Sequence, residues 1–408
     1  MGLRGWRNDL RIALLAMTEP AGAGQPSPRA FLRVAGASLA RHQLGLVVAL
    51  DCQRVVCMAR GTSPDLIALQ HAAEDAGLQF AIVTSPRQLA GQVTAADELI
   101  VVSEGLFVEP ATAAPLLEDR KPAVLVQPVE GALAAGFERI DINRASAGLM
   151  RIPGQLAERL HELPADCDVA SALTRIALQS GVQMREVPAA ARAGTDWRMV
   201  RTESEAYALE NEWLRVRFAD GPTSPGRAVA RLGVVSFGSS MLHAGNASNA
   251  LSAGVVVLLA IACGLGWFAL VPAGFLFAAL AWVLAEASGL LRSAERQALG
   301  LLPPAIPRAD VLSWLTDTVF AALILADTPR FPGQMLFSWL SEPAVLILLL
   351  WLIPRVVKRT ASRWIGDRLL LGVLLGVASA LDQLLPGVQI VSLGLIAAGL
   401  VLAGRQQD

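Results

Sequence analysis

Long apolar segments fill the second half of the chain, and they constrain its fold more than any other feature. Six of them occupy approximately residues 250–270, 272–291, 310–327, 338–354, 369–384 and 388–404. About 20 apolar residues span the ~30 Å hydrocarbon core of a bilayer, so the longer segments suffice and the shorter ones are marginal. The sequence therefore predicts an all-α polytopic membrane domain of six helices over residues 248–408.

The basic residues between these segments predict how the chain is threaded. Six crossings from a cytoplasmic N-terminus place nine basic residues in inside loops and only Arg330 outside. Cytoplasmic loops are enriched in Lys and Arg, so this asymmetry supports the six-helix count. The nine are Arg292, Arg296, Arg308, Arg355, Lys358, Arg359, Arg363, Arg368 and Arg405. We expect a multi-pass protein of the bacterial inner membrane with a cytoplasmic N-terminal domain and no recognisable signal peptide.

The first half of the chain has the pattern of a soluble α/β domain. Short apolar runs at 11–17, 54–61, 80–85 and 97–105 are bounded by turn residues and alternate with helical patterns. One such helix begins with Ser63 as N-cap and Pro64 in its first position. The alternation predicts a mostly parallel sheet with helices on both faces. Ligands in such sheets bind beyond the carboxyl ends of the strands.

Several segments of this half resemble the sugar-phosphate nucleotidyltransferases, a GT-A-like fold. Leu15-Ala16-Met17-Thr18 stands where the family has L-A-A-G, and Pro28-Arg29 stands in the place of its P-K. "ELIVVSEGLF" resembles the strand that delivers the metal-binding Asp, with Glu104 in that place, and Gly148 occupies the later glycine position. The resemblance covers about residues 8–195. It implies that nucleotide phosphates lie near Gly22, Gly24 and Arg29, and that Glu104 ligates Mg²⁺.

The sequence departs from this family where the phosphates bind. The G-x-G-x-R core is replaced by Thr18-Glu19-Pro20-Ala21-Gly22. Glu19 repels phosphate, and Pro20 removes a backbone donor. Two alternatives stay open: a loop shifted onto Gly22 and Gly24 that still binds nucleotide, or a retained fold that has lost nucleotide chemistry.

Between the two halves the sequence predicts a linker over residues 199–247. Residues 202–218 form a charged helical pattern, and 219–226 are a turn cluster. In 227–242, Arg227 and Arg231 alternate with apolar residues, which suits a helix lying on the membrane surface. A plain linker helix is the alternative. The predicted domains are therefore 1–198, 199–247 and 248–408.

Six helices after an amphipathic helix resemble the CDP-alcohol phosphotransferases. The likeness is to bifunctional enzymes of the inositol-phosphate cytidylyltransferase–di-myo-inositol-phosphate-phosphate synthase type, and "ADGPTSPGRAVAR" and "ASNALS" follow their motif order. The family signature D-x2-D-G-x2-A-R-x8-G-x3-D-x3-D binds divalent metal and the CDP pyrophosphate. Placed by Gly289, its acids fall on Ala285, Ser288, Ser313 and Asp317. Three of the four acids are missing, so both catalytic signatures are degenerate.

Four charged residues survive around this place: Glu286, Arg292, Asp310 and Asp317. They are candidates for binding a polar headgroup without metal, because charge within a membrane segment faces a cavity or a partner. Asp317 is the catalytic candidate if the domain is active. The alternative for Arg292 and its neighbours is a solvated helix end.

The sequence thus favours a membrane protein related to phospholipid or polar-headgroup synthesis, with both transfer activities lost. It would bind a nucleotide, an anionic lipid headgroup or a partner enzyme, and association into a homodimer is left open. The alternative is an active nucleotidyltransferase or CDP-alcohol phosphotransferase with a rebuilt site and Mg²⁺. A net charge of -1 gives no support for nucleic-acid binding.

Overall fold

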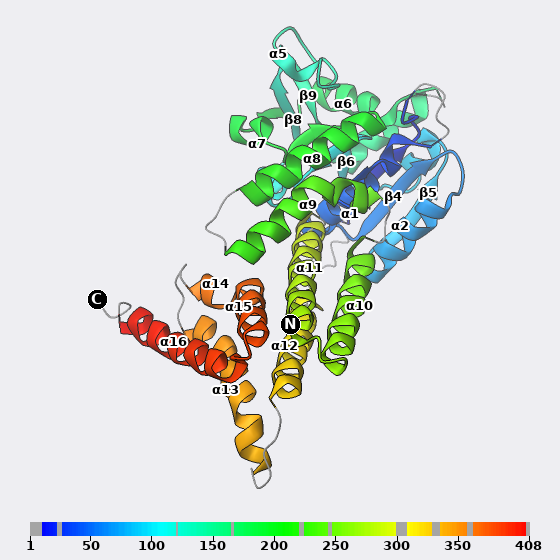
Figure 1. Cartoon of the computed structure of the whole chain (residues 1–408). Helices are drawn as coiled ribbons and strands as arrows, with labels where there is room; N and C mark the ends of the chain where they lie inside the picture. The colour runs from blue at the N-terminus through cyan, green and yellow to red at the C-terminus, as the bar shows by residue number, and fades with distance from the viewer. Residues whose placement is uncertain are drawn as a thin grey trace, which may run out of the picture. The chain divides into compact units, whose positions relative to one another are not determined.

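The computed structural model divides the chain into two compact units (Figure 1). The first comprises residues 1–213 with 295–302, and the second comprises 214–294 with 303–408. The structure describes residues 10–22, 27–119, 121–164, 167–219, 224–243, 247–298, 308–328, 335–356 and 362–404.

A seven-stranded sheet forms the centre of the first unit, in the order β10-β8-β9-β6-β1-β4-β5. All neighbouring strands pair in parallel except β9, which is antiparallel to both β6 and β8. The mostly parallel sheet that the sequence predicted is confirmed. The strands are β1 (Arg11–Met17), β4 (Arg54–Ala59), β5 (Gln79–Val83), β6 (Glu98–Val102), β8 (Ala123–Pro128), β9 (Arg144–Pro153) and β10 (Gln183–Glu186).

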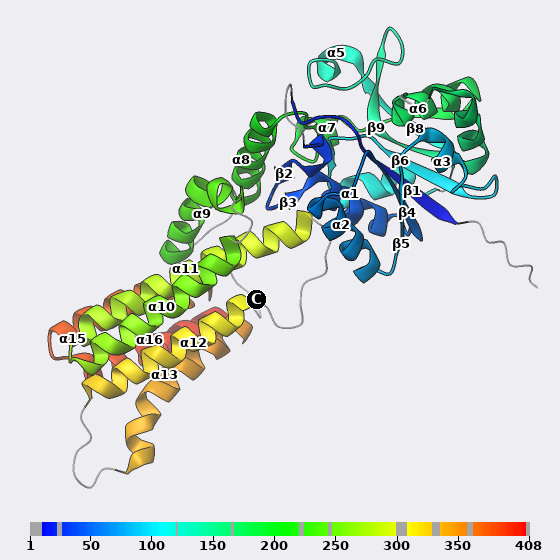
Figure 2. The ribbon, with the colours of Figure 1, turned by 90° about the vertical axis from the view of Figure 1, so that its right-hand side faces the viewer.

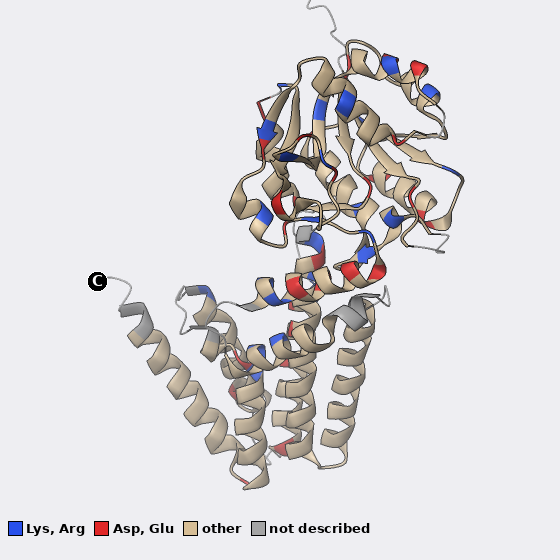
Figure 3. Cartoon of the chain, turned by 90° about the horizontal axis from the view of Figure 1, so that it is seen from above, with Lys and Arg blue, Asp and Glu red and all other residues tan. Residues whose placement is uncertain are grey.

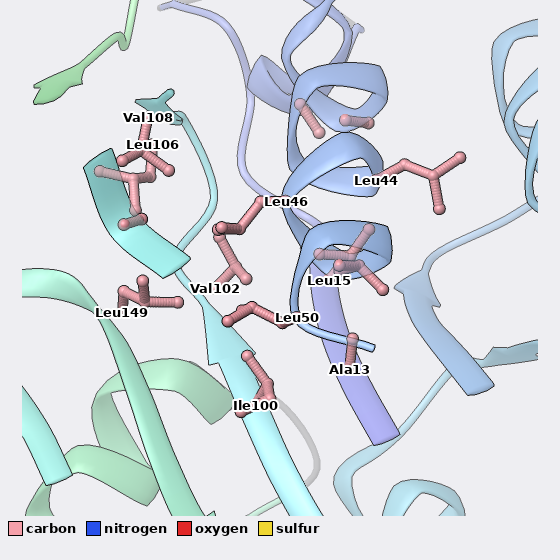
Figure 4. Packing of buried hydrophobic residues seen from close by; sticks show 14 of the residues in the cluster. Ala13, Leu15, Leu44, Leu46, Leu50, Ile100, Val102, Leu106, Val108 and Leu149 are labelled. Carbon is pink, nitrogen blue, oxygen red and sulfur yellow. The ribbon is translucent and has the colours of Figure 1, made fainter. Parts of the chain in front are cut away.

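Helices cover both faces of this sheet and bury a hydrophobic cluster against each. On one face α1 (Leu39–Ala49) packs on β1 and α2 (Pro64–Asp75) packs on β5; Figure 4 shows Leu46 and Leu50 of α1 beside Val102 and Ile100 of β6. On the other face α3 (Pro86–Ala90), the 3-10 helix η3 (Gly154–Glu162) and α6 (Val169–Gln179) close the second cluster. The predicted N-cap of α2 is present, since Ser63 accepts from the Leu66 N–H at 3.1 Å.

Smaller elements complete the unit. Two antiparallel pairs join β2 to β3 and β7 to β11. The remaining elements are η1 (Arg29–Phe31), β2 (Arg33–Val34), β3 (Ala37–Ser38), β7 (Leu106–Val108), α4 (Pro110–Ala113), η2 (Ala114–Leu117), α5 (Val129–Ala132), α7 (Ala189–Ala193) and β11 (Trp197–Met199).

Two helices occupy the predicted linker: α8 (Glu203–Ala219) and α9 (Pro225–His243). In α9, Ala230 and Val234 are buried, whereas Leu232 and Phe237 are each 66% exposed. The position of this helix at a membrane surface, expected from the sequence, stays a prediction.

Apolar helices make up most of the second unit, and in Figure 3 their long ribbons carry few charged residues. Among the helices in the described part of the chain, five are long and apolar enough to cross a membrane. They are α10 (Ala247–Trp267), α11 (Val271–Ala298), α12 (Arg308–Asp327), α13 (Leu336–Val356) and α16 (Leu384–Gly404). The fifth predicted segment, 369–384, contains α15 (Arg368–Ala380), which has only 13 residues and follows the short α14 (Ser362–Ile365).

Several cations of the predicted loops lie in helices, and one of them, Arg368, is also buried. Arg368 was expected in a basic loop, but it is the first residue of α15 and is only 8% exposed. Its charge belongs to the interior of the helical unit, where a carboxylate meets it. Removing Arg368 leaves eight predicted inside residues against one outside, so the charge asymmetry persists.

Candidate functional site

The loop that follows β1 is held by the side chain of Glu104, which comes directly after β6. One carboxylate oxygen, Oε2, accepts from the backbone N–H groups of Thr18 at 2.7 Å and Glu19 at 2.9 Å. The other, Oε1, accepts from the Ala30 N–H at 3.4 Å. Because β1 and β6 are parallel neighbours, their carboxyl ends meet at one edge and bring these groups together. Glu104 therefore takes the place that an anion would take in a nest of backbone donors.

Another donor among the described residues of this loop is also used within the protein. Pro20 has no N–H, and the Ala21 N–H donates to the Ser27 carbonyl at 2.9 Å. The Arg29 guanidinium lies 2.6 Å from the Glu19 carboxylate. Of the groups that the resemblance assigns to phosphate binding, Arg29 thus faces a carboxylate, and so do the Thr18 and Glu19 amides earlier in the same loop.

A cavity of about 80 Å³ lies beside this loop. Four carboxyl groups line it, against the single guanidinium of Arg29; they belong to Glu19, Glu104, Glu138 and Asp168. Burial raises the pKa of the Glu104 carboxyl to about 7, although hydrogen bonds from the Glu19, Thr18 and Ala30 amides act against this rise. An acidic space far smaller than the roughly 300 Å³ of ordinary ligand pockets is poorly suited to a nucleoside triphosphate.

The remaining candidates of this half are placed as follows. Gly22 has a φ of +158°, close to extended backbone, and Gly24 lies outside the described residues. Gly148, in β9, has a φ of +78° and lines the same cavity. Within the described residues, no group of three or more His, Cys, Asp or Glu side chains is arranged to hold a metal ion.

In the helical unit, Asp317 forms a buried ion pair with Arg368. Asp317 is 1% exposed, and Arg368 donates to its two oxygens through Nε and Nη2, both at 3.0 Å. The indole N–H of Trp351 donates to Oδ2 of the same carboxylate at 2.6 Å. The interaction joins α12, α13 and α15. A fork-shaped guanidinium with both nitrogens on one carboxylate is a strong arrangement, so this acid is already satisfied by protein groups.

The other three candidates do not join Asp317. Glu286 lies 3.3 Å from the Arg227 guanidinium of α9. Arg292 donates to Asn249 Oδ1 and Ser252 Oγ of α10, both at 3.2 Å. Asp310 is exposed near the start of α12. The four residues are thus distributed among separate surroundings.

The sequence indicated Asp317 as a candidate but not the residues that contact it. Arg368 and Trp351 follow Asp317 by 51 and 34 positions, and only the packing of three helices brings them together. Asn249 and Arg308 were likewise not singled out, although Arg308 Nη1 also reaches Asn249 Oδ1 at 3.4 Å. The available signal was the placement of Asn249 and Arg308 at the first turns of two apolar helices.

Comparisons with known proteins give structural likenesses only to part of the chain. No family model and no curated protein matches the sequence. Among solved structures, the UDP-glucose pyrophosphorylase from Acinetobacter baumanii is 9% identical, with a TM-score of 0.36, over 51% of this chain and 94% of that one. The inositol-1-phosphate CTP transferase from T. maritima is 12% identical, with a TM-score of 0.36, over 50% of this chain and 96% of that one.

A third similar structure is a UDP-glucose pyrophosphorylase complexed with UDP-glucose. It is 8% identical, with a TM-score of 0.36, over 51% of this chain and 100% of that one. Likenesses of this size do not decide what the chain binds or does, so function has to be argued from its own residues.

Proposed function

We propose that this chain is an integral membrane protein related to the enzymes of phospholipid or polar-headgroup synthesis, and that it acts by binding rather than by transfer. The observation that carries this proposal is the position of Glu104. Its carboxylate accepts hydrogen bonds from the backbone N–H groups of Thr18, Glu19 and Ala30. A phosphate bound beside this loop would need the same donors.

Electrostatics support the loss of nucleotidyl transfer. A nucleotide triphosphate carries several negative charges and needs backbone donors, cations or both close by. Here Glu19 meets Arg29 at 2.6 Å, and the cavity beside them is lined by four carboxyl groups. Binding a triphosphate in the same place would require Glu104 to leave the loop and Glu19 to release Arg29.

The helical unit supports the same proposal for CDP-alcohol transfer. Three of the four signature acids are Ala285, Ser288 and Ser313. The fourth, Asp317, is held by Arg368 and Trp351. A divalent metal prefers several carboxylate oxygens, and these positions do not provide them.

The test uses the full-length protein in lipid nanodiscs with Mg²⁺ and Mn²⁺ in separate samples. CMP release from CDP-alcohols is measured for the unmodified protein and for Asp317→Asn. Pyrophosphate release from CTP, UTP and GTP in the presence of sugar phosphates is measured for the unmodified protein and for Glu104→Gln. We expect neither product from any of these proteins. CMP release that is lost in Asp317→Asn, or pyrophosphate release that is lost in Glu104→Gln, would show an active enzyme with a rebuilt site.

A further inference from the structure

Polar side chains from three apolar helices meet at one end of the helical unit. Asn249 and Ser252 come from α10, Ser288 and Arg292 from α11, and Arg308 from α12. Arg292 Nη2 donates to Asn249 Oδ1 and Ser252 Oγ at 3.2 Å, and Arg308 Nη1 donates to the same Asn249 oxygen at 3.4 Å. The hydroxyls of Ser252 and Ser288 are 3.3 Å apart. We call these five residues the α10–α12 polar cluster.

Helix geometry explains why these residues converge. Asn249 and Ser252 are three positions apart and Ser288 and Arg292 are four apart, so each pair lies on one helix face. Gly289 lets α12 approach α11 closely, because a Cβ at this position would lie 2.9 Å from the Cβ of Ala309. Figures 1 and 2 show α10, α11 and α12 running side by side.

The solvent exposure of the cluster residues increases from the interior of the unit to its end. Ser288 is 2% exposed, Ser252 and Arg292 are half-buried, and Asn249 and Arg308 are exposed. Among the described residues, the cluster is thus most exposed at the end where α10 and α12 begin. This is also the end that the charge asymmetry places on the cytoplasmic side, at the depth of lipid headgroups.

The chemistry of the cluster fits a phosphate group. Two guanidinium groups converge on one amide oxygen, so an anion placed beside that oxygen would be attracted by both. The neighbouring hydroxyls of Ser252 and Ser288 are neutral polar groups that add no negative charge. None of the five residues supplies a carboxylate, the ligand that Mg²⁺ prefers in proteins. Glu286 of the same helix points to Arg227 instead, at 3.3 Å.

We infer that the α10–α12 polar cluster binds the phosphate group of an anionic ligand directly, without metal. The inference deepens the proposed binding function and rests on it for the membrane setting. The phosphate could belong to a phosphatidate-type lipid headgroup or to a soluble phosphate ester, and the two sources are separated by experiment.

The experiment measures binding to full-length protein in detergent, with EDTA present throughout. Dioleoylphosphatidate is titrated by native mass spectrometry beside dioleoylphosphatidylcholine, and glycerol 3-phosphate is titrated by calorimetry. We expect tight phosphatidate binding that weakens by about tenfold or more when Arg292→Gln and Arg308→Gln are combined, since each charge-assisted hydrogen bond contributes substantially. Competition by glycerol 3-phosphate would identify a soluble ester as the source, and its absence would identify the lipid.

Two further variants keep the result interpretable. Arg355→Gln removes an exposed cation from another helix end and should leave the dissociation constant unchanged. Arg292→Lys keeps the positive charge but loses the fork-shaped guanidinium, so it should weaken phosphatidate binding partially. This variant tests the site even if the double variant is unstable. A folded double variant that binds phosphatidate like the unmodified protein, or equal binding of phosphatidylcholine, would overturn the inference. CMP release would instead overturn the proposed loss of transfer and leave the binding results standing.

Discussion

Glu104 is a buried carboxyl group whose charge state affects the stability of the α/β unit. Burial raises the pKa of its carboxyl from 4.5 to about 7. Between these values the folded protein holds a proton that the unfolded chain releases. The free energy of unfolding therefore falls as pH rises through this window, by on the order of 3 kcal/mol from this group.

The variant Glu104→Gln should remove this contribution to the pH dependence. The introduced glutamine cannot ionise and loses part of the hydrogen bonding to the backbone amides. Near pH 5 we therefore expect the free energy of unfolding of the variant to be lower than that of the unmodified protein by about 1 kcal/mol or more. Near pH 8 this difference should close or reverse, because the unmodified protein has then lost the contribution of its protonated Glu104. Thermal unfolding of the full-length protein at both pH values measures the change. Glu118→Gln, at an exposed position, is the control. A parallel pH profile for Glu104→Gln and the unmodified protein would contradict the assignment.

The second prediction concerns the stability of the helical unit, because Asp317 and Arg368 are buried there as an ion pair. Asp317→Asn leaves the Arg368 charge without a counter-ion and should destabilise the helical unit by about 3–5 kcal/mol. Asp317→Leu combined with Arg368→Met removes both charges and should recover most of that loss, apart from the unpaired Trp351 N–H. Thermal unfolding in detergent compares them, with Asp310→Asn as an exposed control. A single variant as stable as the control would argue against a buried pair.

Sequence reasoning could find individual residues of these sites but not their surroundings. Glu104 was found from its place after a strand, and Asp317 because an acid in an apolar segment needs a partner or a cavity. The partner of Asp317 could not be found, since Arg368 follows a basic stretch and has the pattern of a loop residue. The amides that Glu104 binds were invisible too, because backbone donors leave no signature in the sequence.

At the scale of elements, the contact between α11 and α12 depends on Gly289. A Cβ there would lie 2.9 Å from the Ala309 Cβ, closer than unstrained atoms approach. Gly289→Ala should therefore force the helices apart and cost about 1–3 kcal/mol. Gly264→Ala in α10 is the matched control, because nothing lies within 4 Å of its added Cβ. It should be neutral or gain up to about 1 kcal/mol from helix propensity.

Thermal unfolding in detergent separates the two glycine variants, and equal effects of both would contradict the close approach of α11 and α12. The same comparison bears on the inferred phosphate site, since Gly289→Ala should also weaken phosphatidate binding by moving Arg308 away from Arg292.

Most elements were predictable because local patterns decide them. The apolar run 11–17 became β1 with the same bounds, and Ser63 caps α2 as its sequence indicates. Two features were not predictable locally. The antiparallel insertion of β9 depends on pairing with β6 and β8, and the 13-residue length of α15 depends on Asp367, which caps it by accepting from Leu369 and Leu370.

At the scale of the whole helical unit, paired contacts fix the directions of the helices. On α12 and α15, Asp317 meets Arg368 and Asp327 Oδ2 accepts from Ser379 at 3.0 Å. From the first contact to the second, the chain advances ten residues along α12 and eleven along α15, or about 15 Å and about 16 Å of helix. Since both contacts are met in the same order, α12 and α15 run in the same direction. α13 runs opposite to α12, because the Trp339 and Trp351 indoles donate to Thr328 and Asp317 respectively.

These directions explain how a short helix can complete a crossing. α15 begins at the level of Asp317, nine residues into α12, and ends level with the end of α12 at Asp327. The chain before α15 therefore enters the unit without helical structure at Gly366 and Asp367. There its polar groups are satisfied: Asp367 accepts from the Gly226 N–H at 2.7 Å, and the Gly366 carbonyl accepts from Arg368. Non-helical backbone at membrane depth is tolerated where protein surrounds it.

The arrangement predicts six crossings and places the turn after α15 on the same side as the end of α12. In a protein whose Cys52, Cys57, Cys167 and Cys263 are replaced by Ser, single cysteines are introduced as Met335→Cys, Leu381→Cys and Trp364→Cys, all at exposed positions. A membrane-impermeant maleimide on intact cells should label the first two, because they flank the outer ends of α13 and α15. Trp364→Cys should react only after permeabilisation, since it lies between α13 and α15 on the side rich in basic residues. If Leu381→Cys is protected while Met335→Cys is labelled, α15 does not cross, five helices span the bilayer, and α16 leaves the C-terminus outside.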